Sequence, residues 1–313
     1  MPSMADWTTN DIPDLTGRRA VVTGPNSGVG YETALALAGA GAEVILAGRS
    51  EPKGRDALAR IKAAHPRAAV RFERLDLASL ASVAACADRL TAEGAAIDLL
   101  INNAGVMGLP TRQVTEDGFE RQFQTNHLGH FALTGRLLPL LRRGRSPRVV
   151  SLSSLAARRA AIDFDDLQGE RTYGPYRAYQ QSKLATLMFA IELQRRSDAN
   201  GWGLLSDAAH PGWAMTNIFA NGPGARGNKL AKWVAGLVSP VLGQSGAAGA
   251  LPVLYAATAP DAKPAGYYGP TGFIELKGPP GVAKVPAQAN DRGVAARLWE
   301  VSEQLTGVTF GTL

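Results

Sequence analysis

Thr23-Gly24-Pro25-Asn26-Ser27-Gly28-Val29-Gly30 is the stretch that decides the fold of this 313-residue chain. The apolar run 20–22 before it predicts a strand, and residues 31–40 after it have the pattern of a helix. A glycine-rich turn between a strand and a helix lets the backbone approach a pyrophosphate closely, and the helix N-terminus supplies N–H donors and partial positive charge. The stretch therefore predicts a turn that cradles the phosphates of a dinucleotide.

Short apolar runs alternate with longer amphipathic ones along the rest of the chain, which is typical of βαβ units and a parallel sheet. Further strands are expected at 44–47, 70–75, 97–101, 148–152, 204–209 and 267–274. Further helices are expected at 80–90, 118–141, 179–196, 245–257 and 289–305. Because crossovers between parallel strands are right-handed, the pattern predicts an α/β fold with a Rossmann-type doubly wound parallel sheet in three α/β/α layers.

No repeat or linker divides the chain, so we expect a single domain over 15–313 behind a polar N-terminal arm over 1–14. Two segments, 156–177 and 213–244, are too long for plain connections, and long loops in a compact domain are usually functional. The second is the expected substrate loop.

Within that loop, apolar residues recur at the helical spacing i, i+3, i+4, i+7. They are Leu230, Trp233, Val234 and Leu237. Three interpretations stay open: a lid over a lipophilic substrate, a helix packed on the core or on a partner subunit, and a helix at a membrane surface.

The net charge by itself neither requires nor excludes a nucleic-acid partner. The net charge is +6 and the pI is about 9.6, but the excess is scattered apart from the cluster 142–145. No aromatic residues interleave with that cluster, so we expect no nucleic-acid partner.

The single cysteine, Cys86, excludes an intramolecular disulfide and fits a reducing compartment, where we expect it to fill the core. Residues 1–11 have neither a basic nor an apolar region, so we expect no signal peptide. No uncharged apolar run approaches the roughly 18 residues of a transmembrane segment. We therefore expect a cytoplasmic protein.

The end of the second strand bears on the cofactor. It reads Gly48-Arg49-Ser50 and has no carboxylate, which NAD enzymes use there to hold the ribose 2′-hydroxyl. Arg49 has the fork geometry to hold a 2′-phosphate. The sequence therefore favours NADP(H) over NAD(H).

The glycine spacing G-x-x-x-G-x-G in residues 24–30 resembles the fingerprint of the classical short-chain dehydrogenase/reductase superfamily, although Pro25 replaces a small residue and removes one N–H. The likeness covers about residues 15–275 and includes an N-N-A-G motif at 102–105, a serine pair at 153–154, and a Y-x-x-x-K motif at 179–183.

The glycine turn and Arg49, together with the positions that this resemblance adds, define an expected cofactor site. These residues are Thr23, Gly24, Asn26, Ser27, Gly28, Val29, Gly30, Arg49, Asp76, Leu77, Asn103, Ala104, Gly105, Tyr179, Lys183, Pro211, Gly212, Trp213 and Thr216.

Tyr179 and Lys183 are four residues apart and share one face of a helix. A phenol with a pKa of about 10 is a poor base at neutral pH, but a neighbouring ammonium favours the phenolate and lowers that pKa. The pair is therefore expected to serve as a general acid/base. A hydroxyl at the end of the fifth strand can hold the substrate oxygen while hydride moves.

The resemblance assigns the individual roles. Tyr179 is the proton donor or acceptor, Lys183 binds the nicotinamide ribose, and Ser154 rather than Ser153 is the catalytic serine. Asn126 matches the helix asparagine that holds a proton-relay water. His127 and His130 receive no such role and are expected to pack or cap, and no metal site is expected.

The stretch 163–170 between Ser154 and Tyr179 resembles the retinol dehydrogenase-like branch of the superfamily. Light-dependent protochlorophyllide reductases share such a stretch but rely on several cysteines, so we set them aside. We expect an enzyme that transfers hydride between NADP(H) and a small-molecule aldehyde, ketone or alcohol of lipophilic character, as a monomer or a homo-oligomer. The alternative is a catalytically silent NADP(H)-binding regulatory protein, which would typically lack Tyr179 or Lys183.

Overall fold

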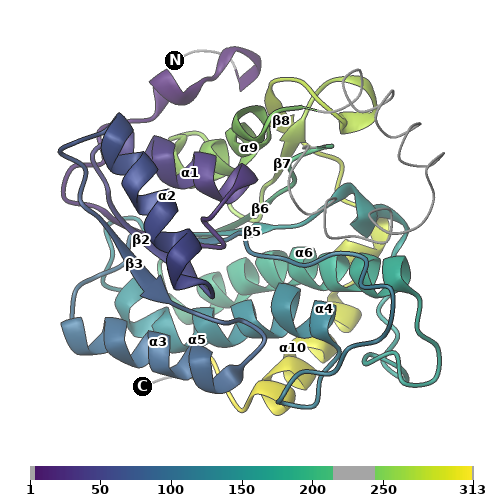
Figure 1. Cartoon of the computed structure of the whole chain (residues 1–313). Helices are drawn as coiled ribbons and strands as arrows, with labels where there is room; N and C mark the ends of the chain where they lie inside the picture. The colour runs from purple at the N-terminus through teal and green to yellow at the C-terminus, as the bar shows by residue number, and fades with distance from the viewer. Residues whose placement is uncertain (1–3, 214–243, 312–313) are drawn as a thin grey trace.

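A central sheet organises the computed structural model, which describes residues 4–213 and 244–311 (Figure 1). Its eight strands run in the order β3-β2-β1-β4-β5-β6-β7-β8. They are β1 (Arg19–Thr23), β2 (Glu43–Gly48), β3 (Val70–Arg74), β4 (Leu99–Asn102), β5 (Arg148–Leu152), β6 (Leu205–Ala209), β7 (Tyr267–Pro270) and β8 (Pro280–Val282). All neighbours pair in parallel except β7 and β8, which are antiparallel. The predicted doubly wound sheet is confirmed.

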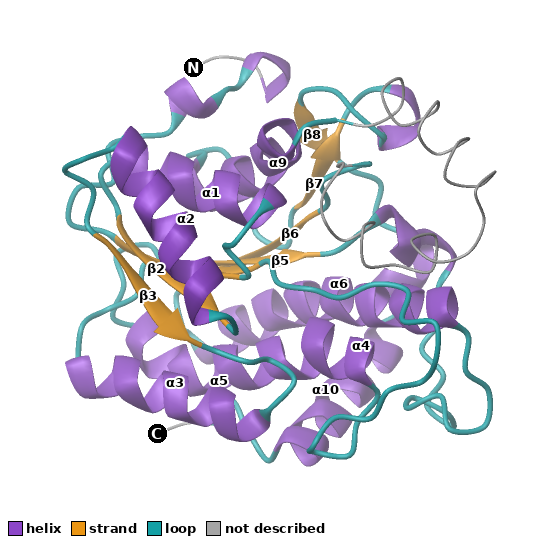
Figure 2. Cartoon of the chain, viewed as in Figure 1, coloured by secondary structure: helices purple, strands orange, loops and turns teal. Residues whose placement is uncertain are grey.

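Helices cover both faces of this sheet and give the three predicted layers (Figure 2). One face carries α1 (Gly28–Gly39), α2 (Glu51–Ala64) and α9 (Gly246–Thr258), and the other carries α3 (Leu80–Glu93), α5 (Gly129–Leu141), α6 (Pro175–Asn200) and α10 (Arg292–Thr306). Successive side chains of a strand point to opposite faces. Val22 therefore joins the core beneath α1 and α9, whereas Val21 joins the core on the face of α3 and α5.

Helix α2 is absent from the sequence prediction. Its sequence is rich in charged residues and contains Pro52 and Gly54, which weakens a pattern-based prediction. The helix is nevertheless held by a narrow buried stripe of Gly54, Ala57 and Ile61. A Cβ at Gly54 would lie 2.1 Å from the Phe72 ring, so the missing side chain is what lets α2 approach β3.

The predicted strand 267–274 is wrong in its second half, and β8 was not predicted. The strand ends at Pro270, and residues Phe273–Glu275 form a 3₁₀ turn. Pro279 and Pro280 then lead into the short antiparallel edge strand. Proline cannot donate to a sheet ladder, so Pro270 ends β7 and Pro280 confines β8 to the edge.

The predicted helix 118–141 is interrupted. It consists of α4 (Arg121–Phe123), a π-helical turn (Gln124–Leu128) and α5. The Glu120 carboxylate accepts the Phe123 N–H at 2.7 Å and fixes the start of α4 three residues later than expected. Single π turns inside helices are frequent at functional sites, and this one contains Asn126.

The N-terminal segment lies along α9. Trp7 is buried and meets Tyr255 of α9 edge to face, with 5.5 Å between ring centroids. The Thr8 hydroxyl accepts the Asn10 N–H, and the Asp11 carboxylate in turn accepts the Thr8 N–H, which fixes the short 3₁₀ helix Thr9–Asp11.

The ends of the expected substrate loop are described, but its interior is not. Residues 214–243, including Thr216 and the predicted apolar helix around 229–238, lie outside the described residues. Within 4–213 and 244–311, no helix is both long enough and apolar enough to cross a membrane.

Candidate active site

The glycine turn joins β1 to α1 at the centre of the sheet. Gly24 and Gly28 have φ angles of +64° and +58°, a left-handed conformation that favours glycine. A Cβ at Gly24 would lie 2.9 Å from the Ala104 Cα, so this glycine also allows two loops to touch. Ser27 is the N-cap of α1 but makes no side-chain capping hydrogen bond. First-turn N–H groups of α1 are therefore free of a side-chain cap and can meet an anion.

Asn103 fastens this turn to the loop after β4. Its side-chain amide donates to the Thr23 carbonyl at 2.7 Å and to the Gly24 carbonyl at 3.2 Å. The Thr23 hydroxyl accepts the backbone N–H groups of Asn103 and Ala104 at 2.9 and 3.0 Å. The glycine turn and the N-N-A-G motif thus form one rigid floor.

His130 connects that floor to the interrupted helix, a contact that sequence reasoning missed. Its Nδ1 lies 3.0 Å from the Asn126 carbonyl oxygen, which can only accept, so Nδ1 carries the proton. Burial lowers the pKa of His130 to about 4, so the ring is neutral and its Nε2 accepts from the Thr23 hydroxyl at 2.9 Å. The spacing of one helical turn signals the contact with Asn126, but no local pattern signals the contact with Thr23.

Arg49 lies exposed at the end of β2, and it forms no ion pair or hydrogen bond with any residue that the structure describes. At the end of the neighbouring strand β3, Asp76 is half-buried and Leu77 is buried. A Cβ at Gly129 would lie 2.5 Å from the Leu77 carbonyl oxygen, so the start of α5 presses directly on this turn. The predicted adenosine end of the site therefore combines a free guanidinium with a fixed backbone.

Ser154 and Tyr179 meet across the sheet edge as predicted. Burial raises the pKa of Tyr179 to about 12, and a hydrogen bond with the Ser154 hydroxyl opposes that rise. Ser153, by contrast, is buried and donates its hydroxyl to the Lys183 carbonyl at 2.8 Å. The structure thus brings Ser154, not Ser153, to the phenol.

Lys183 lies beside Tyr179, with its Nζ 5.9 Å from the phenol ring centroid, and donates to the Leu152 carbonyl at 2.7 Å. Burial lowers the pKa of Lys183 to about 8. A Cβ at Gly105 would lie 3.4 Å from Nζ, so the last glycine of the N-N-A-G motif borders the ammonium. The expected lowering of the tyrosine pKa does not occur, because burial raises it.

Asn126 holds α6 against the loop after the N-N-A-G motif. Its Oδ1 accepts the Val106 N–H at 2.8 Å, and its Nδ2 donates to the Val106 carbonyl and the Ser182 hydroxyl, both at 2.9 Å. Its backbone carbonyl accepts from His130 and from the Thr186 hydroxyl. Its side chain therefore positions Gly105 and Lys183 relative to each other.

The remaining polar candidates are structural. His127 is buried among phenylalanines and contacts the Ser302 hydroxyl at 2.8 Å, which fits the predicted packing role. Cys86 is buried in the core, as predicted. No group of three or more His, Cys, Asp or Glu side chains in the described ranges could hold a metal ion.

Pro211, Gly212 and Trp213 follow β6 at the same edge. The Trp213 N–H donates to the Leu276 carbonyl at 2.7 Å, and Gln244 donates from its backbone to the Trp213 carbonyl at 3.0 Å. The two ends of the expected substrate loop are thus hydrogen-bonded to each other beside the loop between β7 and β8.

The stretch 163–170 packs beside the start of α6. The Gln181 side chain accepts the Asp163 N–H at 2.9 Å and donates to the Leu167 carbonyl at 3.0 Å. Gln168 accepts the Glu120 N–H at 2.8 Å. The stretch therefore connects the N-terminal part of α6, which contains Tyr179, to the start of α4.

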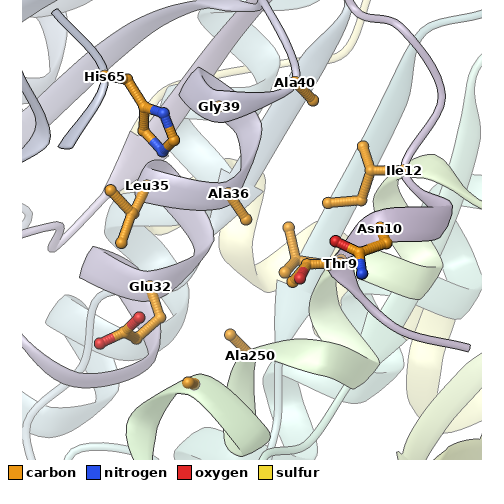
Figure 3. A pocket seen from close by; sticks show the side chains of 12 residues that line it. Thr9, Asn10, Ile12, Glu32, Leu35, Ala36, Gly39, Ala40, His65 and Ala250 are labelled. Carbon is orange, nitrogen blue, oxygen red and sulfur yellow. The ribbon is translucent and has the colours of Figure 1, made fainter.

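A cavity of about 480 Å³ opens elsewhere, between the N-terminal segment, α1 and α9 (Figure 3). Ile12, Leu35, Leu254 and the side chains of Glu32 and His65 line it. None of the predicted catalytic or cofactor-binding residues borders it, so we assign it no part in the chemistry.

Comparisons with known proteins agree with this geometry. The model of a family described as short chain dehydrogenase matches residues 18–222. Polyprenol dehydrogenase from Mus musculus is 40% identical over 316 residues, covering 98% of this chain and 89% of that protein. Retinol dehydrogenase 13 from Homo sapiens is 41% identical over 297 residues, covering 94% of this chain and 86% of that protein. A crystal structure of a Mycobacterium paratuberculosis protein has 40% identity and a TM-score of 0.80, covering 98% of this chain and 99% of that one.

Proposed function

The chain belongs to the short-chain dehydrogenase family, and from that premise we propose that it is an NADP(H)-dependent enzyme that moves hydride between nicotinamide and a lipophilic aldehyde, ketone or alcohol. Membership makes it an oxidoreductase that acts on CH–OH groups. The observation that carries the proposal is the buried Tyr179 phenol, which has the Lys183 Nζ 5.9 Å from its ring centroid and Ser154 close enough to affect its pKa.

The residues present fit a nicotinamide dinucleotide. The glycine turn opens at the N-terminus of α1, where a pyrophosphate would meet backbone N–H groups. Asn26 Oδ1 is buried without a hydrogen-bond partner in the described part of the chain, and it could accept from a cofactor hydroxyl. Arg49 could pair with a 2′-phosphate, which is why we propose NADP(H).

Three side chains of the protein would bind the substrate oxygen and transfer the proton. When bound, the reduced nicotinamide supplies hydride to the carbonyl carbon. Ser154 would hold the carbonyl oxygen by a hydrogen bond as negative charge develops there. Tyr179 keeps its proton at neutral pH, because its pKa is about 12, and would donate that proton to the same oxygen. Lys183, protonated below its pKa of about 8, would stabilise the phenolate left behind.

Two observations support a lipophilic substrate. The relatives reported above carry the names polyprenol dehydrogenase and retinol dehydrogenase, both of which refer to apolar alcohols. Tyr176 and Trp213 are 57% and 41% exposed, and they lie next to Tyr179 and to the turn after β6. An apolar substrate would cover these rings and gain from their burial.

The test is a fluorescence titration of the protein with NADPH and with NADH, followed by turnover of aldehydes and ketones of rising chain length. We expect tighter NADPH binding and a kcat/KM that rises with chain length. Binding of NADPH without turnover of any carbonyl would contradict the enzyme proposal and favour a regulatory NADP(H)-binding protein. Preferential NADH binding would overturn the cofactor assignment alone.

A further inference from the structure

Glu275, in the loop between β7 and β8, joins three parts of the molecule that border the proposed nicotinamide site. Its Oε2 accepts from Nε2 of His210 at 2.9 Å and pairs with Nη2 of Arg158 at 2.5 Å. Its Oε1 accepts the Lys284 N–H at 3.2 Å. Burial alone would raise the pKa of Glu275, but these hydrogen bonds and the Arg158 charge outweigh it and lower that pKa. The carboxylate is therefore ionised at neutral pH.

His210 connects this carboxylate to the turn after β6 by a hydrogen bond at each ring nitrogen. The ring is fully buried, and burial lowers its pKa, so it is neutral. Its Nδ1 accepts the Gly212 N–H at 3.2 Å, which leaves the ring proton on Nε2, where it is donated to Glu275. A Cβ at Gly269 would lie 2.0 Å from Nε2, so β7 packs directly against the ring and leaves it no room to turn.

The turn that His210 holds is the one expected to meet the nicotinamide. Gly212 has a φ of +59°, and a Cβ there would lie 2.3 Å from the Leu276 carbonyl oxygen. Gln244 donates from its side chain to the Pro211 carbonyl at 2.7 Å. The turn is therefore fixed to the loop that contains Glu275, and a shift of that loop moves the turn.

The backbone at Glu275 is strained. Ile274 and Glu275 have φ angles of +44° and +61°, a left-handed conformation that is unfavourable for residues with a Cβ and most unfavourable for a β-branched one. Such strain persists only where surrounding contacts maintain it, and it concentrates at functional sites. Here the contacts are the Glu275 carboxylate bonds and a hydrogen bond of 3.3 Å from Arg158 to the Ile274 carbonyl.

Arg158 completes the connection to the catalytic serine. It lies in the 3₁₀ turn Leu155–Arg159, which Ser154 caps through a hydrogen bond from the Ala156 N–H to its hydroxyl. We propose that Glu275 is a positioning residue for the nicotinamide half of the cofactor. Its carboxylate locks His210, and through His210 the Pro211–Gly212 turn, against the turn that Ser154 caps.

This inference rests on the proposed function, and its test separates the two halves of the cofactor. The Kd values of NADPH and of adenosine 2′,5′-bisphosphate, which lacks the nicotinamide half, are measured for the wild type and for Glu275→Gln. We expect Glu275→Gln to weaken NADPH binding about tenfold, because it removes charge-assisted hydrogen bonds, and to leave the bisphosphate affinity within about twofold. Arg158→Gln, at a half-exposed position, is expected to act in the same direction and serves if Glu275→Gln does not fold.

Glu192 provides the matched control. It too is a glutamate with charge-assisted hydrogen bonds to arginine, here Arg195 and Arg196, but it is buried and lies near the far end of α6. Glu192→Gln should lower thermal stability and leave both affinities unchanged. Wild-type NADPH affinity in Glu275→Gln and Arg158→Gln, or an equal loss for both probes, would overturn the positioning role while the proposed function stands. A wild-type protein that binds neither probe would overturn both.

Discussion

At the scale of single residues, we attribute the proposed preference for NADP(H) to Arg49. This guanidinium is exposed and unpaired among the described residues, so its loss costs little in the free protein. We predict that Arg49→Gln weakens NADPH binding about tenfold and changes NADH binding less than about twofold, because only NADPH carries the 2′-phosphate. Fluorescence titration with both nucleotides measures this.

The control for Arg49 is Arg67→Gln. Arg67 is another exposed arginine. It precedes β3 at the amino ends of the strands, whereas Arg49 follows the carboxyl end of β2. Its replacement should leave both affinities unchanged. Equal losses for the two nucleotides in Arg49→Gln would show that the arginine does not read the 2′-phosphate.

The positions of the site residues were predicted from the sequence more accurately than their pKa values. The spacing of Tyr179 and Lys183 correctly placed both on one face of α6. The predicted lowering of the tyrosine pKa failed because it considered charge without burial, and both side chains are buried. His130 was missed because its partner Thr23 is distant in sequence and becomes a neighbour only when β1 and α5 pack together.

At the scale of elements, Gly129 sets how closely α5 approaches the turn after β3. A Cβ there would lie 2.5 Å from the Leu77 carbonyl oxygen, and backbone cannot yield as a flexible side chain can. We predict that Gly129→Ala lowers the free energy of unfolding by about 1–3 kcal/mol, the usual cost of overpacking. Urea denaturation measures it.

Gly293→Ala in the first turn of α10 is the matched change. A Cβ there meets only an ordinary contact, with Asp291 Oδ1 at 3.4 Å, so the free energy of unfolding should stay within about 0.5 kcal/mol. Equal stability losses in the two variants would contradict the close approach of α5.

Strand β6 carries a buried carboxylate that makes stability depend on pH. Asp207 is fully buried, and burial raises its pKa to about 7, although the Gly266 N–H and Arg148 oppose that rise. Because the folded pKa lies above the unfolded value, the native state binds this proton more tightly. The associated stability is complete below about pH 4 and is lost as the pH rises through about 7.

We therefore predict that Asp207→Asn changes the pH dependence of unfolding. Between pH 5 and pH 8 the wild type should lose about 2 kcal/mol more of its unfolding free energy than the variant does. Urea denaturation at the two pH values measures the difference. Parallel pH profiles for the two proteins would mean that Asp207 titrates normally in the native state.

Sequence patterns were sufficient to predict some helices and strands but not others. The central strands β1, β2, β4 and β5 were predicted from their short apolar runs, and the edge strand β3 from its alternation. Helix α2 was missed because its buried stripe is narrow, and β8 because an edge strand of three residues has no pattern of its own. The π turn at Asn126 was missed because it is short and lies between two helices that read as one.

At the scale of the whole molecule, Cys86 reports on the integrity of the core. It is fully buried, and burial, with the nearby Glu73 carboxylate, raises its pKa to about 12. Only the thiolate reacts with disulfide reagents. We predict no labelling of the native protein by Ellman's reagent at pH 8 and one equivalent in denaturant, followed by absorbance. Rapid labelling under native conditions would contradict the packing of α3 on the core.

The site itself is a property of the whole sheet. Its residues follow the carboxyl ends of β1 to β6 or lie in α6 and in the π turn, and the strand order brings them to one edge. Ligands of doubly wound sheets bind at that edge. The motifs could therefore be assigned from sequence, whereas the Glu275 contacts required the β7–β8 loop, whose course the sequence did not predict.

Tyr179 would donate the proton that accompanies hydride transfer, and a comparison of three proteins tests this role. The kcat for carbonyl reduction and the Kd for NADPH are measured in the wild type, in Tyr179→Phe and in Tyr176→Phe. Tyr176 is an exposed neighbour whose ring lies 6.4 Å from that of Tyr179. We predict that Tyr179→Phe lowers kcat at least about a hundredfold with a Kd within about twofold, while Tyr176→Phe keeps its kcat. A wild-type kcat in Tyr179→Phe would show that another group donates the proton.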